Sequence, residues 1–289
     1  MNASSRNDLA KPNIVSAMIE SLILLGCLVA FAAQPCRADS TPRVQINQAI
    51  QPFALPATDS GLLVDIIRSA FATQKIKSQF VFLPAARSWI SYNQNDVDML
   101  TNAKPDENDK VVYSHWPMLA FRNRVISLKR RNLKLESISD LAKLRIVTFQ
   151  NAHKFFGPEF ADMAAHNKSY TELSTMPARM LNVDHADVVI SQVDIFLYNL
   201  LNENKTAPML DLNEYAYHDI LKTSNQYWFA FRSGLLRDQF ERGIEAIYRS
   251  GEIDAIFNDY RTRFGTSREL FLPLDCQFLT KNRPKKCAD

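Results

Sequence analysis

Apolar residues along the first part of the chain alternate between the spacing of helices and that of buried strands. Between 61 and 71 they recur at helical spacing and form one apolar face, which predicts an amphipathic helix. Short apolar runs predict strands at 44–47, 79–83 and 97–100, and a second helix is expected at 86–94. This β-α-β-α-β order predicts a mainly parallel sheet with helices on its faces.

The same rhythm restarts in the second part of the chain. Further strands are expected at 125–128, 145–149, 186–191, 209–212 and 227–231, and further helices at 137–144, 157–166, 192–202, 235–249 and 253–263. One more helix is expected to begin at a cap formed by Ser174 or Thr175. No Gly/Ser-rich linker separates the two parts, so the pattern predicts two α/β lobes without a flexible tether.

The N-terminal segment is predicted to be a signal peptide covering residues 1–38. Basic residues precede an unbroken apolar run at 22–33, which is shorter than the roughly 20 residues that a membrane-spanning helix needs. Small residues follow it, and cleavage after Ala38 would release the exported mature protein. Two alternatives are an uncleaved anchor and lipidation of Cys27 in Leu24-Leu25-Gly26-Cys27, although the residues that follow stay apolar where a lipoprotein usually turns polar.

Charge and motif content argue against several classes of function. The formal net charge is +3, and bases are interspersed with acids, which argues against a nucleic-acid partner. No nucleophile elbow, metalloprotease motif, phosphate-binding loop or dinucleotide fingerprint occurs, and the five histidines are scattered. We therefore expect no cofactor, no metal site and no catalytic residue, and predict that the protein is not an enzyme.

The cysteines that follow the signal segment predict a disulfide. Cys276 and Cys287 form an even pair in a chain that is expected to reach an oxidising compartment. Their disulfide would close the tail at 276–289 and stabilise the protein by about 3 kcal/mol in the chain-entropy model. The alternative is a metal site, for which two Cys without a nearby His supply too few ligands for tetrahedral zinc.

Several short motifs between 44 and 265 occur in an order that is typical of one class of binding proteins. They are Gln51-Pro52-Phe53, Gly61 with Asp65, Leu83-Pro84-Ala85-Ala86-Arg87, Asn95-Asp96-Val97-Asp98, Tyr113-Ser114-His115-Trp116-Pro117, the segment 135–141, and Gly251 with Ile256. Through these motifs the chain resembles the bacterial periplasmic solute-binding proteins of the type II class (family 3), which serve polar amino acid ABC transporters.

The resemblance implies a fold of two α/β lobes with mainly parallel sheets and a hinge made by two chain crossings, near 119–125 and 212–227. Lobe 1 would comprise 39–122 and 224–275, and lobe 2 would comprise 123–223. A small polar solute, either amino-acid-like or another small organic molecule, would bind in the cleft, beyond the carboxyl ends of the strands, and the lobes would close on it.

The resemblance also implies a monomer that works in the periplasm and delivers its solute to an ABC-type permease. An alternative is an orphan sensor or an accessory subunit of a membrane receptor. A third possibility is an enzyme built on the same scaffold, as a few relatives of this fold are, although no catalytic motif supports it.

The charged anchors that the family uses for an amino-acid zwitterion are missing at the matching positions. Glu107 stands where the family has an Arg that clamps a carboxylate, and Lys104 lacks the planar fork of an Arg. The loop 150–154 lacks the family's glycine, so its backbone is predicted to be less free to wrap a carboxylate. No acid ends the strand in 187–192, where the family often has an Asp. We therefore expect a polar or partly aromatic ligand in preference to a free amino acid.

The remaining candidates for ligand contact are of three kinds. Arg87 would either hold an anion or be a solvated arginine at a helix start. Aromatic residues would either stack on a ligand or pack in the core; they are Phe53, Trp116, Tyr227 and Trp228. The neutral hydrogen-bonding candidates, with one histidine among them, are Thr101, Asn102, Gln150, Asn151, His153, Ser191 and Gln192.

Overall fold

The computed structural model describes residues 41–105, 108, 110–173, 178–203, 212–221, 224–266 and 272–279. The predicted signal peptide and the predicted helix start at Ser174 or Thr175 lie outside the described residues, and so does the strand expected at 209–212 except for its last residue. These features stay predictions. Within the described ranges, every helix is too short or too polar to span a lipid bilayer.

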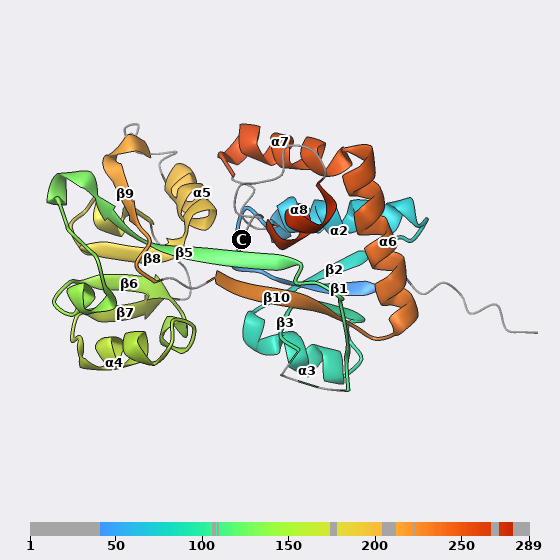
Figure 1. Cartoon of the computed structure of the whole chain (residues 1–289), viewed down its shortest axis with the longest axis horizontal. Coiled ribbons are helices and arrows are strands. Elements are labelled where there is room, and N and C mark those ends of the chain that lie inside the picture. The colour runs from blue at the N-terminus through green and yellow to red at the C-terminus, as the bar shows by residue number, and fades with distance from the viewer. Residues whose placement is uncertain are drawn as a thin grey trace, which may run out of the picture. The chain divides into compact units, whose positions relative to one another are not determined.

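The described strands form one sheet (Figure 1). They are β1 (Arg43–Asn47), β2 (Gln79–Leu83), β3 (Met99–Ala103), β4 (Val112–Tyr113), β5 (Leu119–Leu128), β6 (Ile146–Phe149), β7 (Tyr170–Leu173), β8 (Val188–Gln192), β9 (Tyr215–His218) and β10 (Ser224–Phe231). Their spatial order is β2-β1-β3-β10-β5-β8-β6-β7, with β4 also paired to β10 and β9 also paired to β5. The strands β5 and β10 therefore lie at the centre of the sheet and link its two sides.

Parallel pairing is found where the sequence shows the β-α-β rhythm. β1 pairs in parallel with β2 and β3, and β6 pairs in parallel with β7 and β8. The strands β5, β9 and β10 pair antiparallel with their neighbours. The predicted α/β class is confirmed, and its parallel strand groups lie on the two sides of an antiparallel centre.

The described α-helices are α2 (Leu62–Thr73), α3 (Ser88–Asn93), α4 (Pro158–His166), α5 (Val193–Glu203), α6 (Gly234–Ser250), α7 (Glu252–Phe264) and α8 (Leu272–Phe278). The boundaries of α6 and α7 agree with the prediction to within one residue. α6 begins after Ser233, whose hydroxyl accepts a 3.2 Å hydrogen bond from the Leu236 N–H. It ends at Gly251, which has a φ of 79°. A cap and a left-handed glycine are signals that the local sequence carries.

The helix predicted at 137–144 is a 3₁₀ turn, η4 (Ile138–Leu141). Backbone N–H groups within and after this turn donate to carbonyls three residues back, which is the 3₁₀ pattern. The Asp140 carboxylate accepts a 2.8 Å hydrogen bond from the Ser137 N–H and so caps the turn at its start. The turn is therefore capped at its start, but the α-helix expected over 137–144 is replaced by this tighter turn.

The apolar face of α2 is buried, as its periodicity predicts. Leu63, Ile67 and Phe71 are fully buried and belong to one core cluster with Val44 of β1. From α6, the ring of Phe240 lies 5.3 Å from that of Phe71. This cluster holds α2 and α6 against the β2-β1-β3 side of the sheet.

The strand β8 is buried on both faces, with three consecutive apolar residues at its start. Val188 and Ile190 share an apolar cluster with Phe160 of α4, whereas Val189 shares another with Phe196 of α5. Successive residues of a strand point to opposite faces, so α4 and α5 cover opposite faces of β8.

The strand β5 changes partners along its length. Its first half pairs with β10, and its second half pairs with β8 and β9. The change falls between Arg122, which is opposite Ser224, and Asn123, which is opposite Gln192. The lobe boundaries at 122/123 and 223/224 stay a prediction, because the strands are paired continuously through the centre of the sheet.

Candidate functional site

Arg87 lies just beyond the carboxyl end of β2. Pro84 follows the strand, and Arg87 ends the 3₁₀ turn η2 (Ala85–Arg87) that comes next. Its side chain is exposed, so the guanidinium is accessible to an anion from solution. Open α/β sheets bind ligands at this end of their strands, so the position suits a ligand contact, which stays a prediction.

Thr101 and Asn102 lie near the carboxyl end of β3, next to a glutamine that the sequence motifs did not single out. The buried Thr101 hydroxyl donates to the Gln45 carbonyl across 3.0 Å. Gln45 is fully buried, and its side-chain amide has no hydrogen-bond partner among the described residues, nor has Asn102 Oδ1. Gln45 interrupts the apolar run 44–47, and this polar residue is a sequence signal that could have indicated the group.

Phe53 and Trp116 both pack into the apolar core. Phe53 is 0% exposed, and its ring meets that of Phe121 edge-to-face at 5.9 Å. Phe121 in turn lies edge-to-face against Tyr227, also at 5.9 Å. Trp116 is half-buried and meets Phe278 edge-on at 5.4 Å. The rings of Phe53, Phe121 and Tyr227 therefore form a row where β5 pairs with β10, just before β5 changes partners.

Glu172 organises the loop between β6 and the 3₁₀ turn η5 (Ala152–Lys154). Its carboxylate accepts hydrogen bonds from the N–H groups of Asn151 (2.7 Å) and His153 (3.1 Å). The carboxylate also lies 2.7 Å from His153 Nδ1 and accepts a 2.7 Å hydrogen bond from the Tyr170 hydroxyl. Because β7 is the parallel neighbour of β6, Glu172 reaches a loop that is distant in sequence. No motif singled out this residue.

Asn151 occupies the turn of this loop. Its φ of 64° and ψ of 20° lie in the left-handed region, which Asn adopts more readily than most non-glycine residues. The loss of a glycine therefore has a smaller effect than the sequence suggested. The backbone does wrap a carboxylate, and that carboxylate belongs to Glu172.

Hydrogen bonding keeps the Glu172 carboxylate ionised. Burial favours the neutral acid at Glu172, but the hydrogen bonds from Tyr170, His153 and Asn151 outweigh it and bring the pKa of Glu172 to about 2. Burial also raises the pKa of Tyr170, and its hydrogen bond to the carboxylate raises that pKa further. An ionised carboxylate only accepts hydrogen bonds, so His153 Nδ1 carries the proton in its contact with Glu172.

Acid is expected to destabilise the protein in part through Glu172. Its native pKa of about 2 lies below the ordinary value of 4.5, so its stabilisation is complete above about pH 4.5 and is lost as the pH falls towards 2. We expect Glu172→Gln to lower the free energy of unfolding by about 2 kcal/mol at neutral pH, and to lose less stability on acidification than the wild type. Urea unfolding over a pH series measures both effects, with the exposed Glu159→Gln as control. Parallel pH profiles for wild type and Glu172→Gln would contradict this role.

The end of β8 is followed by an acid that the sequence interpretation did not consider. Gln192 donates from Nε2 to Asp194 Oδ2 (2.9 Å), and its Oε1 accepts a hydrogen bond from the Ile195 N–H (3.0 Å). Ser191, Gln192 and Asp194 are all buried. The strand itself ends without an acid, as expected, but Asp194 lies in the first turn of α5, where the helix N-terminus favours a negative charge.

The other predicted positions are spread over the described chain. Gln150 is exposed and Trp228 is half-buried. Cys276 lies in α8, whereas Cys287 lies outside the described residues, so the disulfide stays a prediction. Glu107 also lies outside them. In the described ranges, no three His, Cys, Asp or Glu side chains are grouped so that they could hold a metal ion.

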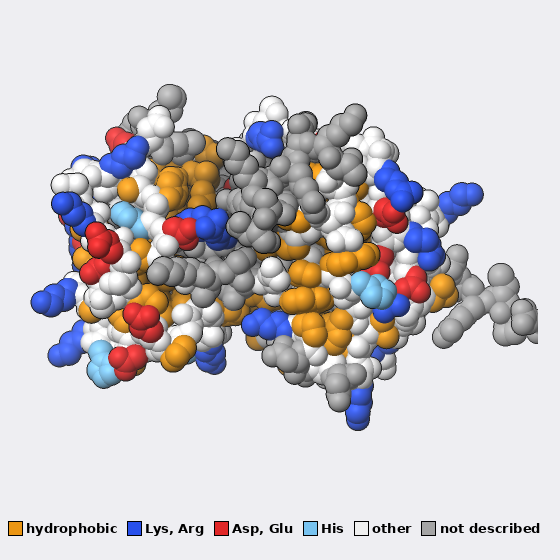
Figure 2. Space-filling view, viewed as in Figure 1, with side chains coloured by type: hydrophobic (Ala, Val, Ile, Leu, Met, Phe, Trp, Pro, Cys, Tyr) orange, Lys and Arg blue, Asp and Glu red, His pale blue; other side chains and the backbone are white. Residues whose placement is uncertain are grey.

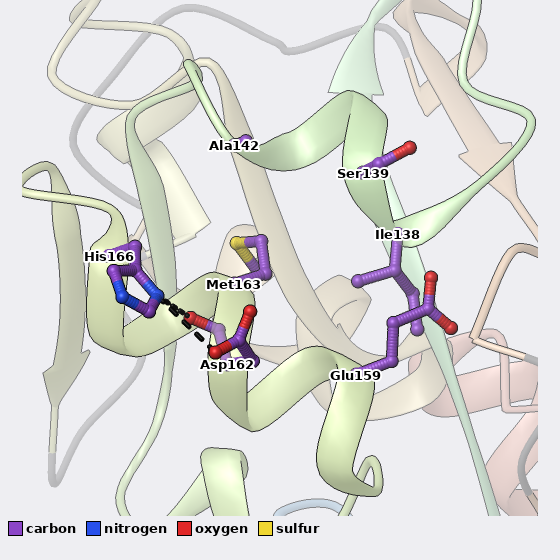
Figure 3. Close-up of a pocket in the computed structure, with 7 residues that line it drawn as sticks. All are labelled: Ile138, Ser139, Ala142, Glu159, Asp162, Met163 and His166. Atoms are coloured by element: carbon purple, nitrogen blue, oxygen red, sulfur yellow. Dashed lines mark hydrogen bonds and ion pairs between the residues drawn. The ribbon is translucent and has the colours of Figure 1, made fainter.

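A pocket of about 290 Å³ lies between η4 and α4 (Figure 3). Its lining residues are Ile138, Ser139, Ala142, Glu159, Asp162, Met163 and His166. The His166 ring nitrogen Nδ1 lies 2.9 Å from the Asp162 carbonyl oxygen. None of the candidate ligand-binding residues lines this pocket. On the face shown in Figure 2, acidic and basic side chains are interspersed, as they are along the sequence.

No protein-family model and no curated protein matches this sequence. Solved structures do match it over most of its length. A histidine kinase sensor domain with similarity to periplasmic binding proteins is 14% identical, and the match covers 76% of this chain and 96% of that one with a TM-score of 0.59. An ancestral arginine-binding protein bound to glutamine is 16% identical, with 78% and 98% covered and a TM-score of 0.57.

A third match is an amino acid ABC transporter substrate-binding protein from Streptococcus pneumoniae bound to L-arginine. It is 18% identical, with 75% of this chain and 93% of that one covered and a TM-score of 0.55. At such identities the likeness shows the fold alone. The chain therefore has the α/β fold of the type II periplasmic binding proteins.

Proposed function

We propose that this chain, whose fold is that of the type II periplasmic binding proteins, is an extracytoplasmic solute-binding protein that closes on a small polar solute. Two of the matched structures hold an amino acid, which supports a binding role for the fold. The observation that carries the proposal is the polar side chains at the carboxyl ends of both parallel strand groups. Arg87 and Asn102 lie at the ends of β2 and β3, and His153 and Gln192 at the ends of β6 and β8.

The proposed movement is a hinge between two lobes, 39–122 with 224–275 and 123–223. β5 and β10 would be the two crossings, because β5 changes partners in the middle and β10 is its antiparallel neighbour. Hinges need only a few residues to change their backbone dihedrals. Closure would bring the polar ends of the two strand groups onto opposite sides of the solute.

We propose export by cleavage of the signal peptide and delivery of the solute, by a monomer, to an ABC-type permease. The match to a histidine kinase sensor domain favours a second candidate, a sensor or accessory subunit of a membrane receptor. Deletion of the gene separates the two candidates once a solute is known. Loss of uptake identifies a transport component, whereas unchanged uptake with a lost response to the solute identifies a sensor.

A solute that binds is expected to raise the melting temperature by several degrees. At 100 times its dissociation constant it adds about 2.7 kcal/mol, which corresponds to roughly 5–10 °C for a domain of this size. A thermal-shift panel of amino acids, organic acids, polyamines, sugars and aromatic acids measures this on protein refolded to remove carried-over ligand. No shift with any class would contradict solute binding and would favour a protein partner.

The thermal-shift panel also tests whether Arg87 contacts the solute. If an anionic group of the solute meets this guanidinium, Arg87→Ala should remove most of the shift produced by that solute. Arg130→Ala is the matched control, because Arg130 is exposed as well and lies in another part of the fold, at η3 (Lys129–Arg131). Equal shifts in melting temperature for both variants would show that Arg87 does not contact the solute.

A further inference from the structure

The loop between β6 and η5 has the construction of an anion-binding site. Asn151 is left-handed and the 3₁₀ turn follows it directly. Consecutive residues of left- and right-handed conformation make a concave nest of N–H groups that binds anions. The N–H groups of Asn151 and His153 point to the same carboxylate. The protonated His153 Nδ1 and the Tyr170 hydroxyl complete a set of four donors.

The carboxylate of Glu172 already fills this nest. A carboxylate has two oxygens with about four acceptor positions, and four donors of the chain surround this one within 3.1 Å. Only 17% of the Glu172 side chain is exposed. A carboxylate of a solute would have to displace Glu172 to reach these donors, and it would then face a second negative charge nearby.

The charges around the ends of these strands, apart from that of exposed Lys154, also disfavour a carboxylate from a solute. Buried Asp194 follows β8, so carboxylates lie near the ends of both β7 and β8. The arginine on β5 that lies opposite Ser191, Arg124, is ion-paired with Asp219 at 3.3 Å. Lys154 is exposed at the end of η5.

We propose that Glu172 is a specificity-determining residue that keeps solute carboxylates away from the nest at Asn151 and His153. This inference rests on the proposed solute-binding function. It restricts the solutes to molecules that present an uncharged or cationic group to this loop, such as an amine, an amide or a hydroxyl. An α-amino acid held by its carboxylate at this loop is excluded.

Chemical rescue with acetate tests the proposal without knowledge of the solute. Glu172→Ala removes the internal carboxylate and leaves room for a free one. We expect acetate to raise the melting temperature of Glu172→Ala in a saturable manner, and to shift the backbone amide resonances of Asn151 and His153. The wild type should show neither effect, because its own carboxylate is held at the nest by the fold, and free acetate would have to compete with this intramolecular group for the same donors. Acetamide and sodium chloride at equal concentrations control for shape and ionic strength.

A matched variant controls for the possibility that acetate stabilises any variant from which a carboxylate has been removed. Glu159→Ala removes an exposed carboxylate from α4 and should show no rescue by acetate. If Glu172→Ala does not fold without additive, recovery of its native amide spectrum on adding acetate, and not acetamide, is the expected result. The proposal is overturned if acetate moves the Asn151 and His153 amides of the wild type, or if no acetate concentration stabilises Glu172→Ala.

Failure of this inference is distinguishable from failure of the proposed function. A solute from the thermal-shift panel whose carboxylate moves the Asn151 and His153 amides would overturn the role of Glu172 and leave solute binding in place. A panel without any ligand, together with acetate rescue of Glu172→Ala, would overturn solute binding and leave the filled nest in place.

Discussion

Replacing Gly243 with alanine is expected to lower the free energy of unfolding by about 3 kcal/mol. Gly243 lies in α6, where that helix crosses α2, and a Cβ at this position would lie 2.0 Å from the Ala70 carbonyl oxygen and 2.6 Å from its carbon. These are backbone atoms of a buried helix, so no side chain can move aside. The two helices must separate, and the contact between Phe240 and Phe71 in the same core loosens.

The melting temperature should fall by roughly 6–12 °C for a loss of this size, which calorimetry or circular dichroism measures. Gly234→Ala is the matched control, because Gly234 begins the same helix and, among the described residues, only the end of the Arg237 side chain comes within 4.0 Å of a Cβ built there. That variant should melt at or slightly above the wild-type temperature, since Ala favours helix over Gly. Equal melting of both variants would mean that α2 and α6 are not in close contact in solution.

Replacing Gly61 with alanine is expected to cost a similar amount and also to displace the segment around Phe53. Gly61 has a φ of 135° and ψ of 152°, a region that is essentially restricted to glycine. A Cβ would lie 2.4 Å from the Phe53 carbonyl oxygen. The Gly61 N–H donates to the Tyr260 hydroxyl (2.9 Å), and this hydroxyl donates to Asp65 (2.6 Å). The Gly61–Asp65 motif thus ties α2 to α7.

Comparison with Gly157→Ala separates two contributions to the stability lost in Gly61→Ala, the steric clash of the new Cβ and the strain of the backbone. Gly157 has a φ of 86° and ψ of 176°, which is the same glycine-only region, but no atom of the described residues lies within 4 Å of a Cβ built there. We expect Gly157→Ala to cost about 1–3 kcal/mol from backbone strain alone, and Gly61→Ala to exceed it by about 1–2 kcal/mol. Urea unfolding of both variants measures the difference, and a smaller loss at Gly61 would contradict the close approach to Phe53.

The loop after the first strand shows what the sequence motifs could and could not predict about the candidate site. Gln51-Pro52-Phe53 pointed to a loop after the first strand, and that loop is present, but Phe53 is fully buried against Phe121. The choice between stacking on a ligand and packing in the core depends on which strand lies beside the loop. β5 lies far away in the sequence, so local reasoning left both possibilities open.

Local pattern was sufficient for the elements whose signals lie within a few residues. The apolar faces of α2 and β8, the cap at Ser233 and the glycine at Gly251 are each set by neighbouring residues. The α/β class follows from the order of such elements, because alternating strands and helices have few ways to bury their apolar faces.

Only the tertiary structure decided how the polar residues are used. Glu172 meets Asn151 because β7 lies beside β6, and Thr101 meets the Gln45 carbonyl because β3 lies beside β1. The period of a strand determines which of its faces is apolar but not which strand will be its neighbour. The sequence by itself therefore determined the class of the fold and the buried faces, whereas strand order decided that a carboxylate of the chain occupies the loop at Asn151.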